Sequence, residues 1–141
     1  MQPVFLDFHI HTSSNPDSLN ESYDIDILKE KVEKVAQGSD YLISFSDHNT
    51  INKAVYLEAV EKIENLLVGV ELHIRNYEKA KPYHCHILFD LKEIDGSVID
   101  DLNLKLDKLY PKKVVSNEDQ IPRIQDIPHP LNSCNDFTIF S

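Results

Sequence analysis

FLDFHIHT, residues 5 to 12, is the stretch that decides the fold of this chain. Its alternating apolar and polar residues predict a β-strand over residues 3–11. Alternate side chains of a strand share a face, so Asp7, His9 and His11 should lie together on one face. The opposite face is apolar and is expected to pack against helices; it carries Val4, Leu6, Phe8 and Ile10.

The His9 and His11 pair has the spacing of a metal clamp. Positions i and i+2 of a strand lie about 6.6 Å apart, which lets two imidazoles lean toward one ion at zinc–nitrogen distances of about 2.0 to 2.1 Å. By itself, an HxH pair is equally typical of partly exposed strand histidines. The functional interpretation therefore depends on what the rest of the chain places beside the pair.

Outward from this strand, the hydrophobic pattern alternates between strands and helices. It predicts a helix over 24–37 ended by Gly38, a strand over 41–46, and a helix over 51–64 capped by Thr50. Strands are predicted over 66–74 and 83–91. A last helix is predicted after the turn at Asp95-Gly96; it begins with a Ser97/Asp100 capping pair and stops before Pro111. Such alternation is typical of a largely parallel sheet or part of a βα barrel. The predicted fold class is therefore α/β, with about four βα units in residues 1–110. Residues 111–141 form a Pro-rich, irregular tail in which only 137–140 resembles a strand.

The composition limits the function classes that fit. The 141 residues are 41% hydrophobic and 27% charged, as expected for one small globular domain. A formal charge of −10 argues against an intrinsic nucleic-acid-binding patch and against binding to anionic membranes. The sequence shows neither a signal peptide nor 18 consecutive apolar residues, so we expect a cytoplasmic protein without a membrane span.

Six of the seven histidines lie at or near strand ends. Beyond the first strand, the relevant segments are FSDHNT with Asp47 and His48, GVELHI with Glu71 and His73, and YHCHILF with His84 and His86. The ends of parallel strands converge on one rim of a βα fold, so this gathering predicts a metal site. Taken singly, His73 and His84 are expected to be hydrogen-bonded bystanders, because each stands beside a better candidate ligand.

The order DFHIHT, SDHN, GVE and HIL resembles the PHP (polymerase and histidinol phosphatase) family of metal-dependent phosphoesterases over residues 3–92. More loosely, LDKLYPKKVVSNEDQIPRIQDI is similar to the PHP domains that precede an SMC-like ATPase in TrlF-type proteins. The resemblance implies a distorted βα barrel with up to three metal ions at its carboxyl-terminal rim. It also implies a phosphate mono- or diester substrate, attacked by a hydroxide that bridges two ions.

Carried over by motif, the resemblance assigns roles to individual residues. The implied metal ligands are His9, His11, Asp17, His48, Glu71 and His86, with Glu71 bridging two ions and Glu71 and His48 at the catalytic centre. Asp7 and Asp47 are expected to orient the ligands. Mixed imidazole and carboxylate ligands suit zinc, manganese or iron, in two or three ions. Asp17 can equally be a solvated loop carboxylate.

The chain also departs from the family pattern. The later histidine and the late Asp-x-His pair are not clearly present, and the remaining His129 lies between prolines. A complete βα barrel typically needs about 200 residues or more, so about half a barrel would be absent unless an ATPase domain or a second chain completes it. Three hypotheses follow: an active phosphoesterase, a truncated and catalytically inactive PHP module with a binding or regulatory role, and an amidohydrolase-type enzyme. Turnover of phosphate esters, metal binding without turnover, or amide hydrolysis would distinguish them.

Overall fold

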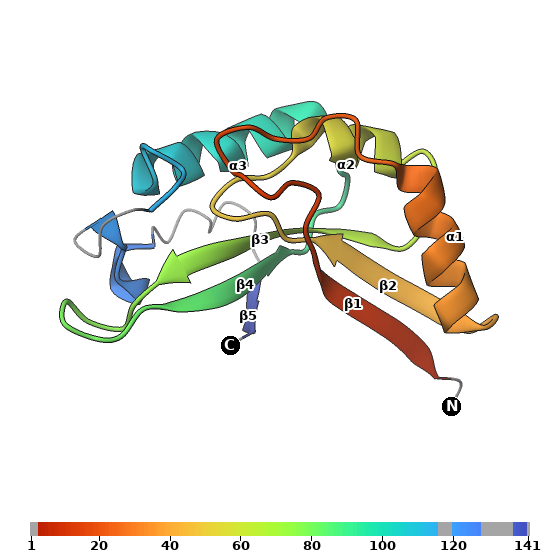
Figure 1. Cartoon of the computed structure of the whole chain (residues 1–141), viewed down its shortest axis with the longest axis horizontal. Helices are drawn as coiled ribbons and strands as arrows, with labels where there is room; N and C mark the ends of the chain where they lie inside the picture. Colours follow the sequence, from red (N-terminus) through yellow and green to blue (C-terminus); the bar gives the residue numbers. More distant parts are fainter. Residues whose placement is uncertain (1–2, 116–119, 128–136, 141) are drawn as a thin grey trace.

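The computed structural model describes residues 3–115, 120–127 and 137–140. Its centre is a sheet with the strand order β1-β2-β3-β4-β5. The strands are β1 (Val4–Ile10), β2 (Asp40–Phe45), β3 (Leu66–Ile74), β4 (Tyr83–Phe89) and β5 (Phe137–Phe140). Helices α1 (Ile25–Ala36), α2 (Lys53–Ala59) and α3 (Gly96–Leu109) lie along one face of this curved sheet (Figure 1). The fold is therefore mixed α/β, as the sequence predicts.

The sheet is only partly parallel, which corrects the prediction of four βα units. β1, β2 and β3 run parallel, but β3 and β4 pair antiparallel as a hairpin, with Glu71 opposite His86 and His73 opposite His84. Residues 75–82 connect them, and this connection is shorter than the dozen or so residues that a parallel crossover requires. The predicted strand at 137–140 is confirmed, and it pairs antiparallel with β4.

The helices begin at side chains that accept hydrogen bonds from free backbone N–H groups. Asp24 caps α1, as expected for a helix that starts there, and the chain leaves α1 through left-handed Gln37 and Gly38. Asn52 caps α2, so the prediction of Thr50 as the cap is wrong, and the helix predicted over 51–64 is shorter, Lys53–Ala59. Asp95 caps α3 in place of the predicted Ser97/Asp100 pair, since its carboxylate accepts from the N–H groups of residues 97 and 98.

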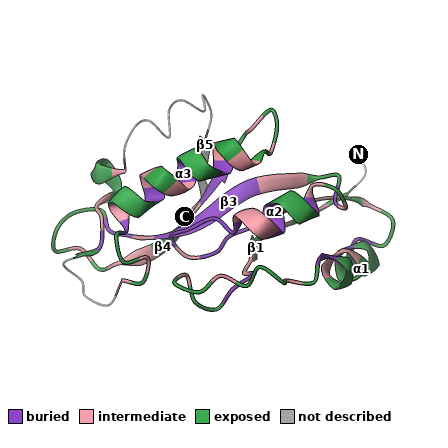
Figure 2. Ribbon diagram, turned by 90° about the horizontal axis from the view of Figure 1, so that it is seen from above, coloured by how far each residue is buried: buried purple, intermediate pink, exposed green. Residues whose placement is uncertain are grey.

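The core lies between the helices and one face of the sheet, and Figure 2 shows buried β3 beneath helices with exposed outer sides. Val68, Val70, Leu72 and Ile74 of β3 belong to this core, so the alternate residues Glu71 and His73 lie on the sheet face away from the helices. On β4 the core residues are Cys85, Ile87 and Phe89, which leaves His84 and His86 on that same opposite face.

β1 differs from the predicted pattern, because its register against β2 shifts between Asp7 and Ile10. A shift of this kind is a β-bulge, and it changes which side chains face the core. Phe5 and Ile10 pack against the core, whereas Val4 and Leu6 are 52% and 56% exposed. The prediction that Val4 and Leu6 are buried against helices is therefore wrong.

Part of the predicted irregular tail contacts the rest of the fold. Ile121 is buried, and its carbonyl accepts a hydrogen bond from Nε of Arg75, just beyond β3. A short 3-10 helix, η2 (Ile124–Asp126), follows. His129 lies outside the described residues. Among the described helices, none combines the length and apolar character needed to cross a bilayer.

Candidate metal centre

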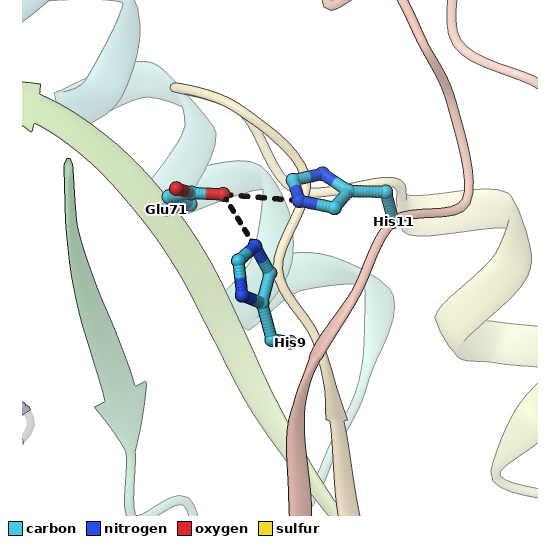
Figure 3. A group of neighbouring side chains, drawn as sticks. All are labelled: His9, His11 and Glu71. Atoms are coloured by element: carbon cyan, nitrogen blue, oxygen red, sulfur yellow. Dashed lines mark ion pairs between the residues drawn. The ribbon is translucent and has the colours of Figure 1, made fainter.

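Glu71 is the residue around which the histidines gather. Its side chain lies on β3, is 2% exposed, and is approached by imidazole nitrogens from β1, β4 and the turn after β2. His9 Nε2 and His11 Nε2 lie 3.2 Å and 3.0 Å from Oε2 of Glu71 (Figure 3). His84 Nδ1 lies 2.7 Å from the other oxygen, Oε1. Imidazole nitrogens thus approach both oxygens of the carboxylate.

Oε2 of Glu71 is buried and has no hydrogen-bond partner among the described residues, although two imidazole nitrogens lie close to it. Burial alone raises the pKa of the Glu71 carboxyl, but the nearby His48, His84, His9 and His11 outweigh burial and hold that pKa below its usual range. The carboxylate is therefore charged at neutral pH. A buried, charged oxygen without a hydrogen-bond donor is costly unless a cation, either a protonated imidazole or a metal ion, lies beside it.

Two groups of side chains have the geometry of a metal site, and both contain Glu71. The first, which we call the first triad, is His9, His11 and Glu71; the second triad is His48, Glu71 and His84. In each triad, the candidate ligand atoms all lie within 4.8 Å of one another. Three protein ligands with an open position are typical of catalytic rather than structural metal sites.

His84 is the residue that sequence reasoning undervalued. It was predicted to be a bystander, yet it makes the shortest contact with Glu71 and belongs to the second triad. Alternation along β4 could have indicated it, because His84 and His86 share a face. Which of the two comes nearer to Glu71 depends on the side-chain conformations.

His86 and His73 complete the histidine cluster. His86 Nε2 lies 3.7 Å from Oε2 of Glu71, and this nitrogen is also buried without a hydrogen-bond partner among the described residues. The His73 ring packs edge-on against His84, with ring centroids 4.9 Å apart. Burial lowers the pKa values of both imidazoles, as it does for His48, and so favours the neutral form that binds metal.

The three predicted aspartates differ in their burial and hydrogen bonds. The Asp17 side chain is exposed and belongs to neither triad; its backbone N–H donates to Oδ1 of Asn15 in a local turn. The Asp7 carboxylate accepts from the backbone N–H of His9 rather than from an imidazole. Asp47 is buried and accepts hydrogen bonds from Thr12 N, Thr12 Oγ1 and Ser13 N at 2.8, 2.6 and 2.9 Å. Asp47 therefore orients the loop that leaves His11.

Three local features bring the cluster together. The β1 bulge precedes Ile10, and His11 follows directly, where the strand ends. The antiparallel register places the beginning of β4 beside the end of β3, so His84 and His86 meet Glu71 without a crossover helix. An isolated bridge pairs His48 with Glu71 just beyond β2. The sequence predicts that the ligands converge where parallel strands end, but His84 and His86 reach Glu71 through the antiparallel β3–β4 hairpin.

The donor set fits a divalent metal ion. Imidazole nitrogens and a carboxylate oxygen suit zinc, manganese or iron, and the unpartnered Oε2 of Glu71 and Nε2 of His86 are atoms that an ion would engage. His9, His11 and Glu71 can hold one ion, and His48, Glu71 and His84 can hold another. The cluster is thus a candidate metal centre.

Comparison of the chain with models of protein families, with curated protein sequences and with solved structures gives no match.

Proposed function

We propose that this chain is a metal-dependent phosphoesterase of the PHP type that hydrolyses a phosphate mono- or diester. The observation that carries the proposal is the unpartnered Oε2 of Glu71, a buried carboxylate oxygen shared by two triads of potential ligands. The order of the DFHIHT, SDHN, GVE and HIL motifs supports the same reaction class. Metal ions held by His9, His11, His48, Glu71 and His84 would supply the positive charge needed to activate water and to stabilise the departing oxygen.

Each residue has a defined part in this proposal. Glu71 would help to hold both ions, one together with His9 and His11 and the other together with His48 and His84. The His9, His11 and His48 nitrogens lie near Oε2 of Glu71, and that of His84 lies near Oε1. His86 stands within 3.7 Å of the shared oxygen and can complete either set. Burial lowers the pKa values of His48 and His86 and so favours the neutral form, whose nitrogen lone pair can bind metal. The chain's net charge of −10 also makes bound cations necessary for attracting a phosphate ester.

The test is hydrolysis of p-nitrophenyl phosphate and bis(p-nitrophenyl) phosphate by the full chain, stripped of metal and then supplied with manganese or zinc. We expect turnover that depends on metal and that falls more than about 100-fold in Glu71→Gln, because even residues that only orient ligands typically contribute 10–100-fold. The matched control is Glu61→Gln, an exposed glutamate, which should retain full activity.

The same experiment separates the competing functions. Stoichiometric metal binding without turnover of either ester would overturn the proposal in favour of an inactive metal-binding module. The open β1 edge, with its exposed Val4 and Leu6, is the feature that favours this second function. Hydrolysis of an amide but of neither ester would instead identify an amidohydrolase.

A further inference from the structure

A small pocket of about 160 Å³ opens beside the second triad. His48 and His84 line one side of it, and both are candidate metal ligands. A group bound there would lie directly against the candidate metal centre.

The pocket is also lined by the segment that follows α3, namely Lys113, Val114 and Val115. Among the described residues that line the pocket, Lys113 is the one with a permanent charge, and no carboxylate is present. This is unusual in a chain with 24 acidic and 14 basic residues. The pocket thus combines one cationic side chain with an apolar wall.

Asn49 fixes this wall relative to the metal centre. Its Nδ2 donates to the carbonyl of Lys113 at 2.9 Å, its Oδ1 accepts from the N–H of His73 at 3.1 Å, and its own N–H donates to the carbonyl of Glu71 at 2.9 Å. Asn49 is buried, so these hydrogen bonds are protected from water. The backbone of Lys113 is therefore tied, through Asn49, to the strand that carries Glu71.

The backbone conformations of the two residues joined by the Asn49–Lys113 hydrogen bond are also unusual. Asn49 and Lys113 both have positive φ angles, of 58° and 35°, which residues other than glycine rarely adopt. Conformations of this kind persist where the surrounding contacts enforce them, and they concentrate at ligand-binding and catalytic sites. Two such residues joined by a hydrogen bond at the edge of one pocket indicate that the pocket has a defined shape.

We propose that this pocket binds the leaving group of the phosphoester, and that Lys113 pairs with an anionic substituent on that group. This inference rests on the proposed function, because it assumes that the phosphorus is held at Glu71. With the phosphate beside His48 and His84, the departing alcohol would extend toward Val114 and Val115. A carboxylate or a second phosphate would then lie against the Lys113 ammonium group. The substrate class is a small phosphomonoester that carries a second anionic group.

The binding test uses product analogues and does not require turnover. 4-Hydroxybenzoate and 4-hydroxyphenylphosphonate are titrated into the metal-free full chain, and amide shifts are followed by NMR. We expect the shifts to centre on Asn49 and Lys113, and affinity to fall about tenfold or more in Lys113→Met, the factor for one lost charge-assisted contact. Tighter binding of one analogue identifies the carboxylate or the phosphate as the preferred group. Lys112→Met is the matched control, since exposed Lys112 does not line this pocket.

A kinetic test then links the pocket to the reaction. Lys113→Met should lower kcat/KM for 4-carboxyphenyl phosphate about tenfold or more while changing that for phenyl phosphate less than about twofold. Equal effects of the Lys112 and Lys113 substitutions, or NMR shifts centred elsewhere, would overturn the inference. If no ester is turned over but binding still depends on Lys113, the proposed phosphoesterase function fails while the anion pocket stands.

Discussion

Asp47 illustrates how one buried carboxylate can organise a candidate metal site without belonging to either triad. Its oxygens accept two backbone N–H groups and one hydroxyl from the loop after His11. The Thr12 hydroxyl also accepts a hydrogen bond from Nδ2 of Asn52, the residue that caps α2. The loop after His11 is therefore linked through Asp47 and Thr12 to the start of α2.

We expect Asp47→Ala to weaken metal binding about 10–100-fold, because such orienting residues typically contribute that much. It should also lower the free energy of unfolding by about 1–3 kcal/mol, since buried donors lose their acceptor. Metal titration by calorimetry and urea denaturation of the metal-free protein measure the two effects. Asp40→Ala, at an exposed position of β2, is the control. Metal affinity equal to that of the wild type would exclude an orienting role.

Most of the candidate site could be predicted from residue types and alternation. His9, His11, His48 and Glu71 were expected as ligands, and the structure brings all four together. The sequence favours His86 over His84 as a ligand, whereas His84 lies nearer to Glu71; both lie on one face of β4, and sequence does not give their distances to Glu71. Asp17 was assigned through a motif position, and an exposed loop carries no periodicity that fixes where its side chain points.

At the scale of secondary-structure elements, Tyr56 of α2 joins β2 to β3. Its hydroxyl accepts from the N–H groups of Phe45 and Gly69 at 3.1 and 2.8 Å and donates to the carbonyl of Phe45 at 2.7 Å. A Cβ at Gly69 would collide with the Ser44 side chain, so the two strands approach closely beside this hydroxyl. The helix thus supplies hydrogen bonds where the backbones of β2 and β3 leave groups unpaired.

Tyr56→Phe should therefore lower the free energy of unfolding by about 2–4 kcal/mol, because two buried N–H groups lose their partner and each costs about 1–3 kcal/mol. Urea denaturation of the metal-free protein measures this loss. Tyr41→Phe, at a partly exposed tyrosine of β2, should change stability by less than about 0.5 kcal/mol. A loss for Tyr56→Phe no larger than that of the control would contradict the role of the hydroxyl.

The order of elements followed from hydrophobic periodicity, and the predicted strands and helices all occur in the structure. Strand direction did not follow, since an apolar run gives no direction, yet the eight residues between β3 and β4 were a usable signal for a hairpin. The β1 bulge was not predictable, because it depends on pairing with β2 rather than on the β1 sequence. The observed caps of α2 and α3 differ from the predicted ones, because several polar residues stand near each helix start and it is Asn52 and Asp95 whose side chains accept the hydrogen bonds.

For the whole molecule, the buried site makes stability depend on pH. Burial lowers the pKa values of His48, His73 and His86 below their ordinary value of 6.5, so the unfolded chain binds more protons than the folded one. The stability that these histidines contribute is complete above about pH 6.5 and is lost as the pH falls below it. Glu71, whose pKa lies below 4.5, adds a second loss in more acidic solution.

We expect the urea concentration at the unfolding midpoint of the chelator-treated protein to decrease as the pH is lowered from about 7.5 to about 5.5. The decrease should be smaller in His86→Asn, because an amide does not titrate. Equilibrium unfolding followed by circular dichroism at each pH measures the midpoint. A wild-type midpoint that stays constant over this range would show that the folded chain does not favour neutral imidazoles.

The sharing of Glu71 by two triads has a mechanical consequence for the chain. An ion in the first triad would link β1 to β3 and so close a loop that contains α1, β2 and α2. An ion in the second triad would link the turn after β2 to the β3–β4 hairpin. Each doubling of a closed loop removes about 0.6 kcal/mol more of unfolded-state entropy. The longest single loop is thus the one that an ion in the first triad would close, and that ion would secure the exposed amino-terminal strand in the way a disulfide does.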